Sequence, residues 1–301
     1  MNSFGLSILL PSYNNKCLEL VKVLQRQCNE ISDLKYEVIV VDDGSNDENI
    51  IACNKAISDI DNCKYIQRDE NTGRAVVRNF LVSQASYQYV LFIDSDMMVE
   101  TGDFIQKYID SISTSDNDIV INGGVAIGKD VKPMRSNLRY LYEKNALSQH
   151  TSKKRQENEY MDFHTANFLT SKDIMIKYPF NEDFKKYGFE DVLLGKTLKK
   201  GGIHIIHIDN PVVFTEDFES NGNFIEKTET SLQTLHEFSY ELKGYSRIDS
   251  FVDKLKKAHL LAITKIAGII ALPIIKKNLT SDKPVRSLFN IYKVLYYASL
   301  K

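Results

Sequence analysis

The fold of this chain is indicated first by residues 89–96, which read YVLFIDSD. A continuous apolar run of this length is typical of a strand that is buried on both faces of a sheet. Two acidic residues, Asp94 and Asp96, follow the run directly. If the chain stays extended there, residues two apart point to the same face, so the two carboxylates would lie together at the end of the strand.

Apolar runs recur on either side of this stretch, and helical patterns separate them at about 16–28, 48–58, 73–85 and 101–113. We expect strands at Ser7–Leu10, Tyr36–Val41, Lys64–Gln67, Tyr89–Ile93 and Asp118–Ile121. This alternation predicts an α/β fold with a mostly parallel sheet covered by helices on both faces. Such sheets bind ligands beyond the carboxyl ends of their strands, where polar clusters stand here at 11–14, 42–45 and 94–96.

The composition bounds the possible functions. The chain has 301 residues, 43% of them hydrophobic and 26% charged, which is an ordinary globular balance. A net charge of only −2 disfavours nucleic acid as the main partner. The four cysteines have no metal-ligand or redox spacing, so we expect a reducing, cytoplasmic compartment. The N-terminus has no basic segment or cleavage site, so we expect no secretory signal.

The charge is distributed unevenly. Residues 251–301 contain ten basic and two acidic residues, a net +8, which leaves 28 basic and 38 acidic residues, a net −10, in residues 1–250. A basic tail on an acidic body indicates contact with an anionic membrane surface, and the alternative is a solvated helical tail. Within the tail, Ala258–Ile275 is mostly apolar and is flanked by lysine pairs. We interpret it as a helix lying on a bilayer, with a buried core helix as the alternative.

The remaining segments give coarser predictions. His150–Glu159 is polar and mixed in charge, so we expect a mobile loop near the site. A short helix is expected from about 190 to 200, ending at Gly201-Gly202. From about 222 onward the chain is expected to be helical, with breaks at Pro273 and Pro284.

Four motifs have residue types that can do chemistry. Asp94 and Asp96 offer hard oxygen ligands for Mg²⁺ or Mn²⁺, and a turn cap is the alternative. Asp42 and Asp43 can accept hydrogen bonds from a nucleobase or ribose, or they can simply form a strand-to-helix turn.

The other two motifs lie at predicted helix starts. Gly73 opens a helix on which Arg78 can pair with phosphate, unless it is a solvated helix-face arginine. Glu190 and Asp191 start a short helix, where they are either dipole caps or a general base and its neighbour.

Taken together, these motifs resemble the inverting family-2 glycosyltransferases of the GT-A fold, along most of residues 5–245. The fit is nearest to the branch with chondroitin-polymerase-like and galactosyltransferase-like bacterial enzymes. The resemblance is carried by LPSYN at 10–14, VVDDGS at 40–45, NTG at 71–73 with Arg78-Asn79, FIDSD at 92–96, and GFED at 188–191 with Leu194-Gly195.

The resemblance implies a role for each of these residues. The loops at Pro11–Tyr13 and Asp42–Asp43 would hold the uracil and ribose of a UDP-sugar. Asp94 would contact the ribose or, through water, the metal, and Asp96 would bind the cation, Mn²⁺ or Mg²⁺. Asp191 would deprotonate the acceptor hydroxyl and Glu190 would bind the acceptor.

One position departs from the family pattern. A His often follows the late Asn-Pro-Val-x segment of relatives and completes the metal site, whereas Phe214 stands there in this chain. His204 and His207 lie upstream and could substitute only if the loop shifts, so a structural role is the favoured interpretation. Phe214 also suggests a catalytically silent binding or scaffold subunit, although the retained acids favour an enzyme. A nucleotidyltransferase is disfavoured because residues 11–15 are not a glycine-rich phosphate loop.

We therefore expect a GT-A domain over 1–245 and a basic, helical, membrane-proximal segment over 246–301. The expected reaction moves a hexose or N-acetylhexosamine from UDP to a hydroxyl of a growing surface glycan. The acceptor would be a glycan or lipid-linked oligosaccharide, and the enzyme would be peripheral at the inner face of the cell membrane, acting in polysaccharide biosynthesis.

Overall fold

The computed structural model describes residues 4–113, 119–215 and 218–301, and the chain divides into two compact units. The first unit comprises residues 1–128, 149–185 and 194–215, and the second comprises residues 129–148, 186–193 and 216–301. The division falls inside helix α8, Glu190–Lys200. The boundary near residue 245 was inferred from charge and apolar content rather than from contacts, and it stays a prediction.

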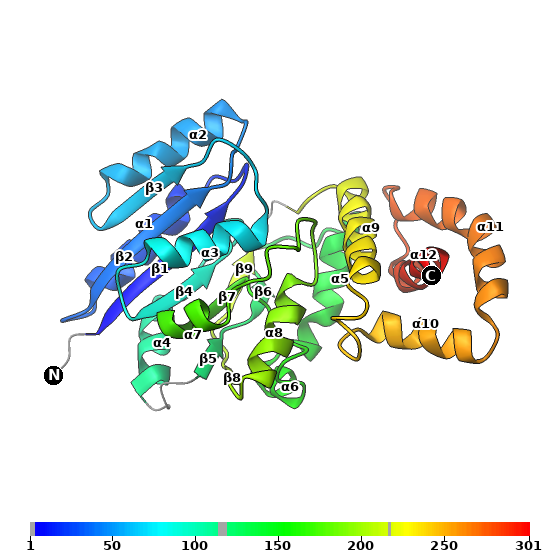
Figure 1. Ribbon diagram of the computed structural model, residues 1–301. Coiled ribbons are helices and arrows are strands. Elements are labelled where there is room, and N and C mark those ends of the chain that lie inside the picture. Colours follow the sequence, from blue (N-terminus) through cyan, green and yellow to red (C-terminus); the bar gives the residue numbers. More distant parts are fainter. Residues whose placement is uncertain (1–3, 114–118, 216–217) are drawn as a thin grey trace. The chain divides into compact units, whose positions relative to one another are not determined.

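Within the described residues, the first unit contains a seven-stranded sheet in the order β3-β2-β1-β4-β7-β5-β8 (Figure 1). In this sheet β7 runs antiparallel to β4 and β5, and the other neighbouring pairs are parallel. A smaller parallel sheet pairs β6 with β9. The strands are β1 (Gly5–Ser12), β2 (Lys35–Asp42), β3 (Cys63–Gln67), β4 (Tyr89–Ile93), β5 (Ile119–Asn122), β6 (Val125–Ile127), β7 (Asn167–Ser171), β8 (His204–His207) and β9 (Val212–Phe214).

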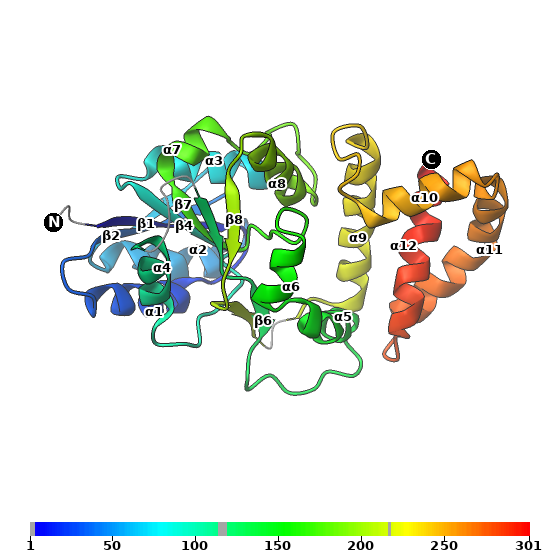
Figure 2. The ribbon, with the colours of Figure 1, turned by 90° about the horizontal axis from the view of Figure 1, so that it is seen from below.

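Helices cover both faces of the large sheet, because alternate residues of each strand point to opposite faces. Ile8 of β1 packs in the core under α1 (Leu18–Asn29) and α4 (Phe104–Ser113), whereas Leu9 packs in the core under α3 (Arg74–Gln84) and α7 (Lys172–Lys177). In Figure 2 α3 and α7 lie above the sheet, and α1 and α4 lie below it. The remaining helices of the unit are α2 (Glu48–Lys55), η1 (Ala56–Asp59) and α6 (Ser152–Glu157).

The predicted α/β fold is thus confirmed. All five expected strands are present, although Asp118 of the fifth lies outside the described residues. The four expected helices of the first 113 residues and the helix at 190–200 are present as well. Strand β1 lies between β2 and β4, so the chain order reverses there. The carboxyl ends of β1 and β4 flank a topological switch point, the usual ligand-binding place of such sheets.

The second unit is helical. Figure 1 shows α12 (Arg286–Leu300) enclosed by α9 (Asn221–Glu237), α10 (Arg247–Lys257) and α11 (Leu261–Leu279). Its core joins apolar residues of α9, α11 and α12 with α5 (Leu138–Ala146), which η2 (Leu147–Gln149) follows. The buried members are Leu138, Ile225, Ile275, Leu279, Phe289 and Tyr292. The expectation of helices from about residue 222 onward is confirmed.

Two expectations are wrong. Pro273 does not break the last helices but lies inside α11. It faces solvent, and the carbonyl that loses its donor is that of the exposed Ile269, where water can replace the lost hydrogen bond. Residues 150–159 are not a loop throughout, because α6 forms there with Thr151 as its cap. Arg155 in this helix is only 2% exposed, whereas most of the polar residues around it are exposed, so a single buried arginine stands in an otherwise solvated helix.

Candidate functional site

The carboxyl ends of β1 and β2 are tied together by their loops. Ser12 pairs with Asp42 in register, and the backbone N–H of Asp43 donates to the Ser12 carbonyl at 2.8 Å. The backbone N–H of Asn14 donates to the Ser45 hydroxyl at 2.7 Å. Pro11 is half-buried and Tyr13 is exposed, so the predicted nucleoside loop presents an aromatic ring to solvent beside the switch point.

Asp42 is fully buried and its two oxygens have partners within the protein. Its Oδ1 accepts a hydrogen bond from the backbone N–H of Ser45 at 2.7 Å, and its Oδ2 accepts one from the hydroxyl of Tyr65. Burial, and after it this carboxylate, raises the pKa of Tyr65. The first contact is a turn of the kind given above as the alternative for this motif. A contact with ribose stays a prediction.

Asp43 joins the end of β2 to the start of α3. Its Oδ2 accepts hydrogen bonds from the backbone N–H groups of Thr72 and Gly73 at 3.0 and 2.9 Å. Its Oδ1 accepts from the Thr72 hydroxyl at 2.8 Å and from Arg68 at 3.1 Å. Sequence reasoning missed Arg68, and it quoted Thr72 only as part of the NTG motif, without a role. Asp43 therefore holds the start of α3 against the end of β2.

Glycine is needed at two points of this region. Gly44 has φ +76°, and a Cβ there would lie 2.4 Å from the backbone of Glu70. Gly73 has φ +95° and caps α3 in a conformation that side chains rarely adopt. The two glycines let the loops after β2 and before α3 approach each other, and the first of them lies in the strand-to-helix turn that was the alternative for Asp42 and Asp43.

Arg78 and Asp94 form an ion pair at the end of β4. The guanidinium Nη2 lies 2.8 Å from Asp94 Oδ1, and the group stacks over Phe180 at 5.3 Å. Arg78 is 1% exposed, so it is not the solvated helix-face arginine that was the alternative. Because its charge is held against Asp94, it orients that carboxylate. A direct contact with phosphate stays a prediction.

Asp94 and Asp96 are the open acids of this edge. The Asp94 side chain is 17% exposed and Asp96 is exposed. No group of three or more His, Cys, Asp or Glu side chains suited to a metal ion occurs in residues 4–113, 119–215 and 218–301. Two carboxylates that keep exposed surface nevertheless suit Mg²⁺ or Mn²⁺, which commonly take one or two carboxylates and complete their coordination with water and substrate phosphates.

Phe214 lies on the strand that runs beside these acids. Val213 and Met98 exchange backbone hydrogen bonds of 2.8 and 2.9 Å, so β9 is held against the segment that follows Asp96. Phe214 packs on the apolar core under α1 and α4. The position at which relatives often carry a His is therefore occupied here by an aromatic ring in an apolar contact.

The two upstream histidines have structural partners. His204 is largely exposed and lies 3.2 Å from Glu159. His207 is buried, with Nε2 2.8 Å from the Glu159 carbonyl and Nδ1 3.0 Å from Arg155. Burial lowers the pKa of His207 to about 4, so the ring is neutral, with its proton on Nε2. These contacts favour the structural interpretation over metal binding.

Arg155 is the main feature of this unit that sequence reasoning missed. Its guanidinium donates to the carbonyls of His150, Asn122, Gly123 and Ile208 and to the Asn122 side chain, over 2.7 to 3.2 Å. Burial lowers the pKa of Arg155. The signal available in the sequence was Thr151-Ser152, which can cap the helix-forming run that follows. This network closes the carboxyl ends of β5 and β8.

Glu190 and Asp191 belong to the second unit, at the start of α8. The turn before them is strained, because Gly188 has φ +104° and Phe189, a non-glycine residue, has φ +67°. A Cβ at Gly188 would lie 2.3 Å from the hydroxyl of Ser231 on α9. Such strain commonly occurs at functional sites, and α9 holds this turn in place.

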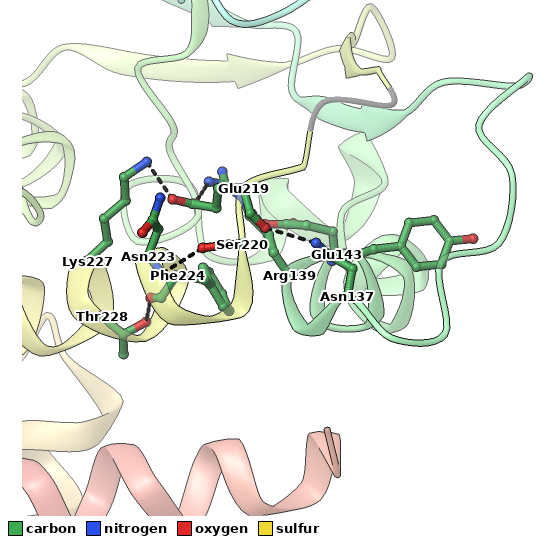
Figure 3. Close-up of polar contacts among 10 residues, drawn as sticks. Asn137, Arg139, Glu143, Glu219, Ser220, Asn223, Phe224, Lys227 and Thr228 are labelled. Atoms are coloured by element: carbon green, nitrogen blue, oxygen red, sulfur yellow. Dashed lines mark hydrogen bonds and ion pairs between the residues drawn. The ribbon is translucent and has the colours of Figure 1, made fainter. Parts of the chain in front are cut away.

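Helix α9 is itself anchored by a charged cluster, which Figure 3 shows. Glu219 accepts from Arg139 of α5 and lies 2.7 Å from Lys227 of α9. Ser220 caps α9 by accepting from the backbone N–H of Asn223 at 3.2 Å. Near the other end of α9, the Thr234 hydroxyl donates to the Tyr187 carbonyl at 3.0 Å. The acidic turn is thus positioned by a helix that is fixed near both ends.

The sequence profile described as glycosyl transferase family 2 matches residues 7–178, more than half of the chain. The chain is 25% identical over 244 residues to the chondroitin synthase of Escherichia coli, which covers 71% of this chain and 35% of that protein. It is 33% identical over 97 residues to the teichoic acid poly(glycerol phosphate) polymerase of Staphylococcus epidermidis, covering 30% and 12% of the two chains. The chain therefore spans little more than a third of the first relative and less of the second.

Two solved structures share the architecture. TarS from S. aureus in complex with UDP gives a TM-score of 0.51 at 20% identity and covers 99% of this chain and 90% of that one. The mannosyltransferase PcManGT from Pyrobaculum calidifontis, in complex with GDP-Man and Mn²⁺, gives 0.59 at 17% identity and covers 98% and 85%. These likenesses confirm the expected fold class, GT-A with a helical C-terminal extension.

Proposed function

Because the chain belongs to glycosyl transferase family 2, we propose that it transfers a hexose or N-acetylhexosamine from a UDP-sugar to a hydroxyl of a growing surface glycan, with inversion. The observation that carries this proposal is the contrast, at one edge of the sheet, between acidic residues that are buried and acidic residues that are exposed. Asp42 and Asp43 are buried and hold the loops in place, whereas Asp94 is partly exposed and Asp96 is exposed. Such an edge offers a shaped place for a nucleotide beside carboxylates that keep exposed surface.

The donor is assigned to the loops after β1 and β2 and to the end of β4. Tyr13 is available to contact the uracil, and Asp42 and Asp43 shape the wall for the ribose. Arg78 holds Asp94 in one orientation. In relatives, UDP accompanies TarS and GDP-Man with Mn²⁺ accompanies PcManGT. We assign Mn²⁺ or Mg²⁺ to Asp96 and Asp94, where the cation would neutralise charge on the departing diphosphate.

Asp191 is assigned as the general base and Glu190 as the acceptor-binding residue. Asp191 would take the proton of the acceptor hydroxyl while that oxygen forms a bond to the anomeric carbon. The bond from the anomeric carbon to the UDP oxygen would break in the same displacement, on the opposite face of the sugar, which inverts the configuration. The strained turn at Gly188-Phe189 would hold the base in position during this step.

The compartment is assigned from the thiols. Cys17 and Cys28 are buried and free, and burial raises the pKa of each to about 12, so both stay protonated and unreactive. Free cysteines of this kind suit the reducing cytoplasm. We propose that the enzyme works there, at the inner face of the cell membrane, on a glycan or lipid-linked oligosaccharide.

A second candidate function is a catalytically silent sugar-nucleotide-binding subunit. Phe214 favours it, because this ring packs on the core where a metal-binding His often stands in relatives. The two candidates differ in turnover but share nucleotide binding.

The deciding experiment is calorimetric titration with UDP, with and without Mn²⁺, followed by a screen of UDP-sugars for UDP release. Wild type is compared with Asp96→Ala and with Asp59→Ala, an exposed carboxylate on η1. We expect metal-dependent binding that Asp96→Ala loses and Asp59→Ala keeps, followed by turnover. Binding without turnover of any UDP-sugar would support the silent subunit. If the wild type did not bind UDP, both candidate functions with a UDP-sugar as the ligand would be contradicted.

A further inference from the structure

Helix α11 exposes an apolar face that lacks the charged residues usual on a solvated helix. Five isoleucines on it, Ile263, Ile266, Ile269, Ile270 and Ile274, are between 62% and 76% exposed. Leu260 just before the helix is exposed as well. Single exposed apolar residues are ordinary on protein surfaces, but a contiguous group on one helix marks an interaction site.

These isoleucines are not needed for the core of the second unit. The opposite side of α11 packs on α12 through Ile275 and Leu279, which are buried, and through Gly268, which lies close to the backbone of Leu295. Figure 1 shows α11 as the outer neighbour of α12 within this helical unit. The helix therefore has one side fixed by packing and one apolar side turned outward.

Basic residues border this apolar face at both ends. Lys256 and Lys257 end α10 before the face, and Lys277 follows it; all three are exposed. Lys276 lies there too, paired with Glu229 at 2.7 Å. No acidic residue occurs between Asp253 and Asp282 in the sequence. The face is thus an apolar centre with a positively charged rim.

We propose that this face of α11 docks on an anionic lipid surface, with the isoleucines in the acyl boundary and the lysines against the headgroups. An amphipathic helix binds a bilayer through buried apolar area and through attraction between basic residues and anionic lipids. The bend between α10 and α11 places the lysine pair at the start of the face, since His259 at the bend has φ +59° and Leu260 N–H bonds to the Leu255 carbonyl at 2.9 Å. The proposal does not depend on the catalytic assignment.

A second copy of the chain fits the face less well than lipid does. If two such faces met, in either direction, lysines of one copy would lie against lysines of the other, and the segment has no acid to pair with them. A span across the bilayer also fits less well. Among the described residues no single helix is long and apolar enough for one, and α10 and α11 meet the length and composition criteria only as a pair bent by 120°.

The test is co-sedimentation of the whole chain with vesicles of phosphatidylcholine alone and of phosphatidylcholine mixed with phosphatidylglycerol. Three variants are compared with wild type: Ile266→Ser with Ile270→Ser, Lys256→Gln with Lys257→Gln, and the control Ile176→Ser. Ile176 is a 61% exposed isoleucine on α7 of the first unit. Because all the substituted side chains are exposed, thermal unfolding should be unchanged and should verify folding.

We expect wild type and Ile176→Ser to pellet with the anionic vesicles and to be released by high salt or alkaline carbonate. The isoleucine pair should weaken binding at least about tenfold, and the lysine pair by about fivefold for each charge. Equal pelleting of wild type and the isoleucine variant would overturn the proposal. So would resistance to carbonate, which indicates a span, or a dimer in light scattering that the isoleucine variant loses, which indicates a second copy.

Discussion

The carboxyl edge of the large sheet has two halves that differ in what their polar groups contact. At the ends of β1, β2 and β4, two acids are closed by internal hydrogen bonds, and two others, Asp94 and Asp96, keep exposed surface. At the ends of β5 and β8, Arg155 and His207 are buried and contact protein acceptors. Polar composition alone therefore does not distinguish the two halves, whereas the remaining exposure of their side chains does.

The largest expected effect is a loss of activity at the ends of β1, β2 and β4, where Asp96 is exposed. Asp96→Asn keeps the size of the side chain but removes the charge, so we expect UDP release from the donor to fall by about 10³-fold. The free energy of unfolding should change by less than about 0.5 kcal/mol, because the side chain is exposed. Steady-state kinetics and urea unfolding measure the two quantities. A large loss of stability with little loss of activity would reverse the comparison between the halves.

The next effect is a loss of stability at the ends of β5 and β8, where Arg155 is buried. Arg155→Met removes a buried guanidinium and leaves its carbonyl acceptors without donors, so we expect a loss of about 3 kcal/mol in the free energy of unfolding. The control is Lys154→Met, whose side chain is exposed and forms a surface ion pair with Glu157 on α6. Urea unfolding should separate the two variants clearly. Equal stability of both would mean that the network contributes nothing.

The strands and the acidic pairs could be predicted from sequence, because both are local patterns. A continuous apolar run such as 89–93 specifies a buried strand without knowledge of its neighbours. Whether an acid is open or closed could not be predicted, since Asp43 takes its partners from Arg68 and from the start of α3, more than 20 residues away.

The same reason explains the error at residues 150–159. Arg155 is buried because carbonyl acceptors from β5 and from the end of β8 converge on it, 32 to 53 residues away along the chain. Nothing in a polar, mixed-charge segment distinguishes that outcome from a solvated loop. The expected break at Pro273 is wrong for a related reason, since Ile275 and Leu279 of the same helix pack in the core, which a local pattern does not reveal.

The third effect is a loss of stability at the ends of β1, β2 and β4, where Asp43 is buried and hydrogen-bonded. Asp43→Asn keeps one acceptor but turns the other into a donor that faces the N–H groups of Thr72 and Gly73, and it leaves Arg68 without its ion pair. We expect a stability loss of about 2 kcal/mol. The control is Asp69→Asn, an exposed acid beside Arg68 in sequence. If Asp43→Asn abolished UDP binding without any loss of stability, Asp43 would have to be grouped with the open acids.

The fourth effect is a pH dependence of stability at the ends of β5 and β8, where His207 is buried. The folded pKa of His207 is lowered to about 4 by burial, whereas the unfolded value is 6.5, so below pH 6.5 the unfolded chain binds the proton more readily. The stability that the neutral ring provides is complete above pH 6.5 and is lost as the pH falls toward 4. Between pH 7 and pH 5 this histidine should account for a loss of about 2 kcal/mol.

His207→Gln should remove that share of the pH dependence, and His204→Gln should leave it, because His204 is largely exposed. Burial also lowers the pKa of His150, so part of the slope remains in both variants. The difference between the two stability curves, measured by urea unfolding at each pH, therefore isolates His207. If the curves of both variants were parallel to that of wild type, folding would not lower the pKa of His207, and the ring would be positively charged at pH 5, so the contact with Arg155 could not then be a hydrogen bond to a neutral nitrogen.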